Sequence, residues 1–92
     1  MELELRLFAT VREAVGQRIL TREFDPETTV ADALATLEAE YPPLEGQLLD
    51  GSEVARSITV LCNGTHVTHL EGSETVLADG DTLSITPPVT GG

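Results

Sequence analysis

The sequence predicts an α+β domain of two layers, with one main helix packed across a mixed sheet of four to five strands. Three patterns indicate this fold: alternating apolar and polar residues at the start of the chain, a longer stretch of helical spacing in the middle, and strands joined by tight turns in the second half. The 92 residues suffice for one such domain. Because a helix crosses between the two halves of the sheet, the first and last strands should be parallel neighbours.

The first part of the chain predicts two strands joined by a short helix. Apolar residues occupy every second position over residues 3–7, which is the period of a half-buried strand. Residues 10–15 have helical composition and are followed by Gly16, a residue type that commonly ends helices. Residues 18–24 then predict a second strand, whose two faces are both mixed in character.

The main helix is predicted to begin at Thr29, after a proline turn. Asp32 follows Thr29 at the spacing of a capping box, in which each side chain binds the other residue's backbone N–H. The apolar residues that recur at helical spacing are Val30, Leu34, Leu37 and Tyr41. Pro42-Pro43 ends the helix, because the residue before a proline disfavours the helical conformation. Residues 44–49 predict one further short turn.

The second half of the chain predicts the remaining strands. Residues 57–62 form a third strand, and Asn63-Gly64 forms its hairpin turn because both residue types accept a positive φ. Residues 65–70 are predicted to return as the partner strand. A turn at residues 79–81, whose aspartates we assign to the turn, precedes the last strand at residues 82–86.

The last strand is followed by the sequence Pro-Pro-Val-Thr-Gly-Gly. Proline cannot continue a β ladder, so we predict a globular domain over residues 1–86 and an extended tail over residues 87–92. Pro87, Pro88 and Val89 are predicted to position the tail, because consecutive prolines hold a chain extended. Such a tail reaches roughly 20 Å from the sheet when fully extended.

The two glycines are the predicted working end of the tail. Gly91 and Gly92 lack a Cβ, so this segment can enter a narrow channel of a partner enzyme. The Gly92 carboxylate becomes an acyl donor once it is activated by adenylation. A thiol or sulfide then yields a thioester or thiocarboxylate, and an amine yields an amide, without a catalytic residue on this chain. A glycine pair alone also fits a frayed terminus; the preceding proline pair and the end of the chain at Gly92 favour the donor.

The charge balance limits the classes of partner. Sixteen acidic and five basic residues give a formal net charge of −11, which disfavours a nucleic-acid binder because phosphate would be repelled. A basic partner, or a basic groove on a partner, is favoured, and acidic residues such as Glu38 and Glu40 are expected on a solvated face. All five basic residues are arginines, so no side chain can accept an isopeptide bond. High salt screens self-repulsion, and this composition is typical of proteins adapted to it.

Other patterns concern compartment and metal binding. The chain has no stretch of about 18 apolar residues and no basic, apolar leader, so we expect no membrane span and a cytoplasmic protein. Cys62, the single cysteine, lies in an apolar strand and is predicted to be a core residue and not a nucleophile. His66 and His69 should point to opposite faces of their predicted strand and therefore cannot share a metal ion. We predict no metal site, no catalytic residue and a monomer.

Several segments resemble, in the same order along the chain, the ubiquitin-like sulfur carriers of the MoaD and ThiS type. The MoaD-type carriers serve molybdopterin synthase. The similar segments are residues 5–9, 11–13, 29–34, 60–64 and 77–92. The most specific is the last, which runs Asp-Gly-Asp from Asp79 and ends in Pro-Pro-Val-Thr-Gly-Gly. The acidic, lysine-free composition makes the chain most similar to the small archaeal modifier proteins of halophilic archaea.

This resemblance implies a β-grasp fold and a carrier or modifier that is not itself an enzyme. It implies that an E1-like activating enzyme of the ThiF/MoeB type adenylates Gly92, using ATP and magnesium that the chain itself does not bind. In a sulfur branch, Gly92 would become a thiocarboxylate that feeds molybdopterin synthesis or tRNA thiolation. In a modifier branch, Gly92 would form an isopeptide bond with a lysine of a target protein.

Three functions remain open at this point. The first is a modifier that also carries sulfur. The second is a dedicated small subunit of molybdopterin synthase, whose partner would be the large subunit, and the third is a non-covalent β-grasp adaptor. Many MoaD-type carriers have an aromatic residue before the proline pair, where this chain has Thr86. That departure and the acidic surface favour the first function, and the tail weakens the third.

Overall fold

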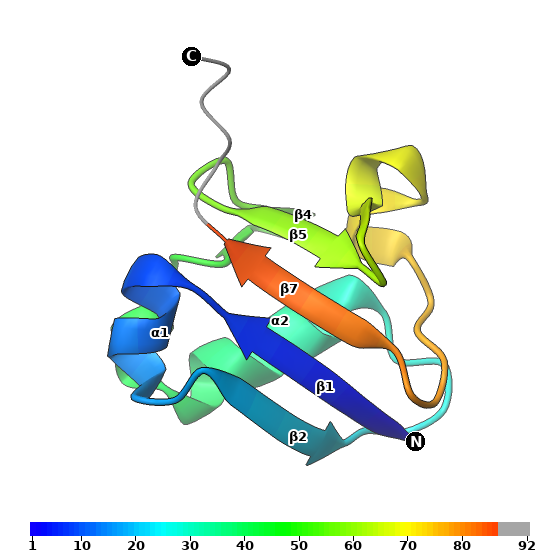
Figure 1. The fold of residues 1–92 in the computed structure, drawn as a ribbon. Coiled ribbons are helices and arrows are strands. Elements are labelled where there is room, and N and C mark those ends of the chain that lie inside the picture. Colours follow the sequence, from blue (N-terminus) through cyan, green and yellow to red (C-terminus); the bar gives the residue numbers. More distant parts are fainter. Residues whose placement is uncertain (87–92) are drawn as a thin grey trace.

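The computed structural model describes residues 1–86 (Figure 1). The helices are α1 (Ala9–Val15) and α2 (Val30–Glu40), and the strands are β1 (Glu2–Leu7), β2 (Ile19–Glu23), β3 (Leu49–Asp50), β4 (Glu53–Val54), β5 (Thr59–Cys62), β6 (Thr65–His66) and β7 (Thr82–Thr86). Short 3₁₀ helices lie between them: η1 (Pro42–Leu44), η2 (Val67–His69) and η3 (Gly72–Glu74). Among these described residues, no helix is both long and apolar enough to cross a bilayer.

The main sheet has five strands in the order β2-β1-β7-β5-β6, and α2 crosses one of its faces (Figure 1). β1 and β7 are parallel, with Leu5 opposite Leu83 and Leu7 opposite Ile85, whereas the other neighbouring pairs are antiparallel. β3 and β4 form a separate two-stranded sheet. This is a β-grasp arrangement, so the predicted fold class and the parallel pairing of the first and last strands are confirmed.

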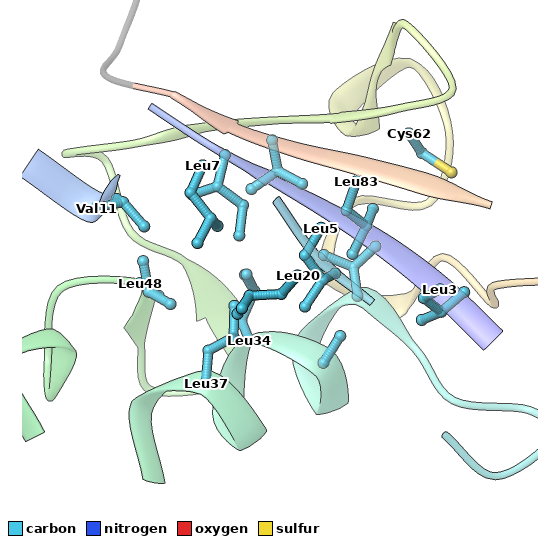
Figure 2. Close-up of a cluster of buried hydrophobic side chains, with 14 of the residues drawn as sticks. Leu3, Leu5, Leu7, Val11, Leu20, Leu34, Leu37, Leu48, Cys62 and Leu83 are labelled. Atoms are coloured by element: carbon cyan, nitrogen blue, oxygen red, sulfur yellow. The ribbon is translucent and has the colours of Figure 1, made fainter. Parts of the chain in front are cut away.

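The core lies between the main sheet and α2. Leu3, Leu5 and Leu7 point inward from β1 and are at most 1% exposed. Leu34 and Leu37 of α2 approach them from the other side (Figure 2) and are equally buried. Because burial of one such side chain contributes about 1.5–3 kcal/mol, the alternation in β1 fixes which face of the sheet the helix covers.

The predicted helix and hairpin ends are confirmed. The Thr29 hydroxyl accepts the Asp32 N–H, and the Asp32 carboxylate accepts the Thr29 N–H, both at 3.1 Å, which completes the capping box. α1 ends at Gly16, whose φ of 84° lies in the left-handed region that favours glycine. Asn63 and Gly64 both have positive φ, 52° and 86°, and close the turn between β5 and β6.

The strand predicted for residues 65–70 is wrong beyond His66. β6 ends at His66 and the chain turns into η2, where the Val67 side chain is only 1% exposed. Nδ1 of His66 accepts the Thr68 N–H at 3.2 Å and so caps this turn. A side chain therefore takes a backbone donor that a continuing strand would have used in its ladder.

The segment predicted as one further turn, residues 44–49, also differs. The turn begins earlier, at Pro42, and Leu49 instead enters β3. The Glu38 carboxylate of α2 accepts the N–H groups of Leu48 and Leu49, at 2.9 and 3.0 Å. Glu38 therefore holds the β3–β4 hairpin against the helix and is not simply part of a solvated face.

Candidate functional site

β7 ends within the sheet, between two neighbouring strands, at the point where the predicted tail begins. Its last residue, Thr86, lies opposite Thr59 of β5, and Ile85 lies opposite Leu7 of β1. The Phe8 N–H donates to the Ile85 carbonyl at 3.1 Å. Backbone pairing on both sides therefore fixes the attachment point of the tail.

The residues of the predicted site itself lie outside the described residues. These are Gly91 and Gly92, predicted to be activated, and Pro87, Pro88 and Val89, predicted to position the tail. Their roles stay predictions, as does the domain boundary after residue 86. The described surface around the attachment point is what a partner enzyme would meet beside them.

An aromatic and a cationic side chain lie beside this attachment point. Phe8 continues β1 in an extended conformation and is 37% exposed. The Arg12 guanidinium of α1 lies 5.8 Å from the centre of the Phe8 ring, and its Nε donates to the Leu7 carbonyl at 3.2 Å. An exposed contact of this kind is worth about 0.5–1 kcal/mol, so the pair is a preformed surface, both apolar and positive.

The sheet face opposite α2 carries a row of side chains to which all five strands contribute. The register aligns neighbouring strands through these residues, in spatial order Ile19, Arg6, Ser84, Leu61 and His66. The alternation in β1 already implied that Arg6 faces away from the core. The sequence pattern did not reveal that these five residues form one row, because that depends on the order and register of the strands.

The aspartates of the turn before β7 do more than shape it. The Asp81 carboxylate accepts the Ala78 N–H at 2.8 Å and the side-chain amide of Asn63 at 2.9 Å. The Asp79 carboxylate accepts the Glu2 N–H at 2.7 Å. Their assignment to the turn is confirmed, and they also tie the start of β7 to β1 and to the β5–β6 turn.

Cys62 is a core residue, as predicted. It is 7% exposed, and its Sγ lies 3.8 Å from the Asp81 carboxylate. The pKa of the Cys62 thiol is raised, mainly by burial and to a smaller extent by the negative charge of Asp81 and by the hydrogen bond between the thiol and the Asp81 carboxylate. The thiol therefore stays protonated at neutral pH, which makes it unsuited to nucleophilic attack.

The predicted geometry of the two histidines is wrong. His69 belongs to η2, and its ring meets the His66 ring edge to face, with the centres 6.1 Å apart. Nδ1 of His66 also lies 2.8 Å from the Thr68 hydroxyl, so one of its nitrogens is already engaged. Within residues 1–86, no group of three or more His, Cys, Asp or Glu side chains is placed to hold a metal ion.

The chain is similar to small modifier and carrier proteins along its length. It is 52% identical over 92 residues to Small archaeal modifier protein 3 of Haloferax volcanii, and the match covers all of both chains. It is 31% identical over 80 residues to Sulfur carrier protein CysO of Mycobacterium tuberculosis, with 84% of this chain and 83% of the relative covered. By name, the first relative is a modifier protein and the second is a sulfur carrier protein.

Solved structures share the fold. The solution structure of the Haloferax volcanii HVO 2177 protein matches with a TM-score of 0.90 at 52% identity, covering 100% of this chain and 87% of that one. A chain of the Amycolatopsis orientalis BexX/CysO complex matches with a TM-score of 0.81 at 25% identity, covering 98% of this chain and 99% of that one. A similar carrier is therefore known bound to a partner protein. Residues 5–92 match the profile of the ThiS family, and the chain belongs to that family.

Proposed function

We propose that the protein is a ubiquitin-like modifier and sulfur carrier whose reactive group is the Gly92 carboxylate. The observation that supports this best is the end of β7, held between β1 and β5 at the base of a Gly91-Gly92 tail, in a chain of the ThiS family. A rigid base limits the volume that the tail end can explore. It thereby lowers the entropy cost of placing the carboxylate in a partner's active site.

Activation requires a partner enzyme, because a free carboxylate is a poor acyl donor. In an E1-like enzyme of the ThiF/MoeB type, which holds ATP and magnesium, a Gly92 carboxylate oxygen attacks the α-phosphorus and pyrophosphate leaves. Attack of a sulfide on the acyl adenylate releases AMP and leaves a thiocarboxylate. Attack of a lysine amine releases AMP and a proton and leaves an isopeptide bond. Both routes use ATP, and we expect them in the cytoplasm.

The composition of the chain favours it as the acyl donor over the acyl acceptor in these reactions. The sequence has arginines but no lysine, so its side chains offer no amine to another activated carboxylate. Cys62 is buried, with a raised pKa, and is not available to take over the acyl group. The chain therefore acts as the donor, and the acceptor is either sulfide or a lysine of another protein.

The first test removes Gly91 and Gly92. The full chain should support ATP–pyrophosphate exchange by the ThiF/MoeB-type enzyme of the same cells, and the shortened chain should support none. Thr90→Ser, which leaves both glycines in place, is the matched control and should retain exchange. Far-UV circular dichroism should be the same for all three proteins, because the core lies within residues 1–86. Exchange that survives removal of both glycines would refute the proposal.

The second test identifies the acceptor. Intact-mass spectrometry of protein from its own cells should show a gain equal to one oxygen-to-sulfur exchange at Gly92. Digests of the same cells should show lysines of other proteins that carry this tail. Arg56 is the last trypsin site, so a Thr90→Arg variant is used to shorten the remnant to Gly-Gly. Sulfur gain without any conjugate would instead indicate a dedicated sulfur carrier, of which a molybdopterin synthase subunit is one kind.

A further inference from the structure

The arginines are scattered through the sequence but gather at one end of the fold. The chain has five, Arg6, Arg12, Arg18, Arg22 and Arg56. All except Arg22 lie on or next to elements at the end of the sheet where β7 terminates, which is also where α1 and the start of β5 lie (Figure 1). In a chain with a net charge of −11, this clustering is the main departure from an acidic surface.

The strand register and the α1 contacts place two of them. Arg6 lies opposite Ser84 on the outward face of the sheet, one pair before the end of the β1–β7 ladder. Arg12 lies over the Phe8 ring, and Phe8 is bonded to β7 through its backbone N–H. Arg6 is therefore paired two residues before Thr86, and Arg12 contacts a residue whose backbone is bonded to Ile85.

The other two flank this point on either side. The Arg18 carbonyl accepts the Leu7 N–H at 2.8 Å, which places Arg18 beside the end of β1. Arg56 comes shortly before β5, whose first residue, Thr59, lies opposite Thr86. Neighbouring strands are about 4.8 Å apart, so the start of β2 and the start of β5, three strand spacings apart at this end of the sheet, are separated by about 15 Å.

These four residues, Arg6, Arg12, Arg18 and Arg56, are called the arginine arc below. Arg6 is ion-paired, with its Nε 2.8 Å from Glu4, but the pair leaves it 52% exposed. Arg18 and Arg56 are exposed and make no ion pair with any residue of 1–86. Glu13 of α1 and Glu53 of β4 are acidic residues near these elements that form no ion pair within residues 1–86.

The remaining arginine and the acidic residues at the opposite end provide the contrast. Arg22 is bonded to Glu40 at 2.6 Å and to the Tyr41 hydroxyl at 2.9 Å, so its charge is used within the fold. The start of β1, the end of β2 and their adjoining turns carry acidic side chains, namely Glu2, Glu23, Asp25, Glu27, Asp79 and Asp81. The molecule is therefore electrically polar, and the tail is attached at its positive end.

We propose that the arginine arc docks against an acidic rim around the channel of the activating enzyme that receives the tail. The inference rests on the function proposed above. An acidic rim would repel the rest of this chain and attract only the end that carries the tail, so it would orient the encounter productively. Phe8 and Ile19, 37% and 50% exposed, lie beside the arc and supply apolar contact next to the charges. The basic groove expected from net charge alone is thus replaced, for this face, by an acidic one.

The test changes the arc without touching the tail. ATP–pyrophosphate exchange by the ThiF/MoeB-type enzyme of the same cells is measured against carrier concentration for Arg18→Gln/Arg56→Gln. Loss of two interfacial charges should raise KM about tenfold and leave kcat within about twofold, because docking is weakened and chemistry is not. Ala35→Glu/Ala39→Glu is the matched control, since it changes the net charge by the same amount on the exposed side of α2. Its KM should stay within about twofold of the wild type.

The outcomes separate the inference from the function on which it rests. A KM that rises only in the arc variant supports docking through these arginines. An unchanged KM, or an equal rise in both variants, would overturn it while leaving the proposed function intact. Absence of exchange with the unmodified chain would count against the proposed function itself. Melting curves of both variants check that each remains folded.

Discussion

Asp81→Ala should lower the free energy of unfolding by about 2 kcal/mol. The carboxylate accepts two short hydrogen bonds, from the Ala78 N–H at 2.8 Å and the Asn63 amide at 2.9 Å, and a long, weak one from the Cys62 Sγ at 3.8 Å. A hydrogen bond to a charged group contributes about 1.5–3 kcal/mol, and exposure reduces this to about 1 kcal/mol for each of the two short bonds. In a domain of this size, a loss of about 2 kcal/mol lowers Tm by about 8–16 °C.

Thermal unfolding followed by far-UV circular dichroism measures this effect. The measurement is made at about 1 M salt, where the Debye length is about 3 Å. Removing one negative charge from an acidic chain relieves charge repulsion, and at this salt concentration that stabilising effect is screened. Asp79→Ala is the control, because its carboxylate accepts one backbone bond, from Glu2, and should cost about half as much. Asp81→Asn keeps one acceptor oxygen and should fall between the wild type and Asp81→Ala. If Asp81→Ala melts no lower than Asp79→Ala, the reasoning is refuted.

Two further predictions concern α2 and the core. Thr29→Ala removes one arm of the capping box and should cost about 1 kcal/mol in urea unfolding, whereas Thr29→Ser should cost much less; equal stability of both would contradict the cap. Because the pKa of the Cys62 thiol is raised, the folded state keeps this proton longer than the unfolded chain does. The protonated thiol contributes its full stabilisation below the usual thiol pKa, and this contribution is lost as the pH rises through the pKa of Cys62 in the folded state. Cys62→Ala should therefore show a shallower alkaline decline in Tm, and an unchanged decline would count against this account.

The parts of the fold that could be predicted are those determined by local periodicity. Alternation over residues 3–7 predicted β1 and its buried face, and the Thr29–Asp32 spacing predicted the start of α2. Asn63-Gly64 predicted a hairpin turn because few residue pairs adopt two positive φ angles. In each case the deciding interaction lies within a few residues along the chain.

The parts that were wrong depend on side chains that bind distant or competing backbone groups. Glu38 accepts N–H groups ten and eleven residues further along the chain, and no local pattern predicts such a contact. His66 ends β6 by bonding the Thr68 backbone, although residues 65–70 have strand composition. Glu38 is a case in which a tertiary contact overrides propensity, and His66 is one in which a local side-chain hydrogen bond to the backbone does so.

The candidate site also has a part that local sequence patterns predict and a part that depends on the tertiary fold. The tail residues were predicted from sequence alone, because a Gly-Gly pair shortly after a proline pair is a local feature, and their roles stay a prediction. The arginine arc was not, because Arg6 and Arg56 are distant in sequence and only the order of β1, β7 and β5 brings them to one end. Net charge pointed to a basic partner since it averages over both ends of the molecule.

The parallel pairing of β1 and β7 has a mechanical consequence. β1 begins at one end of the sheet, and β7 ends at the other, so tension between the start of the chain and its tail acts along both strands in opposite directions. The pairs from Glu4–Thr82 to Leu7–Ile85 are then loaded together in shear, whereas strands peeled apart from one end would break one pair at a time. A chain attached to a target through its tail is thus built to resist being pulled open from that attachment.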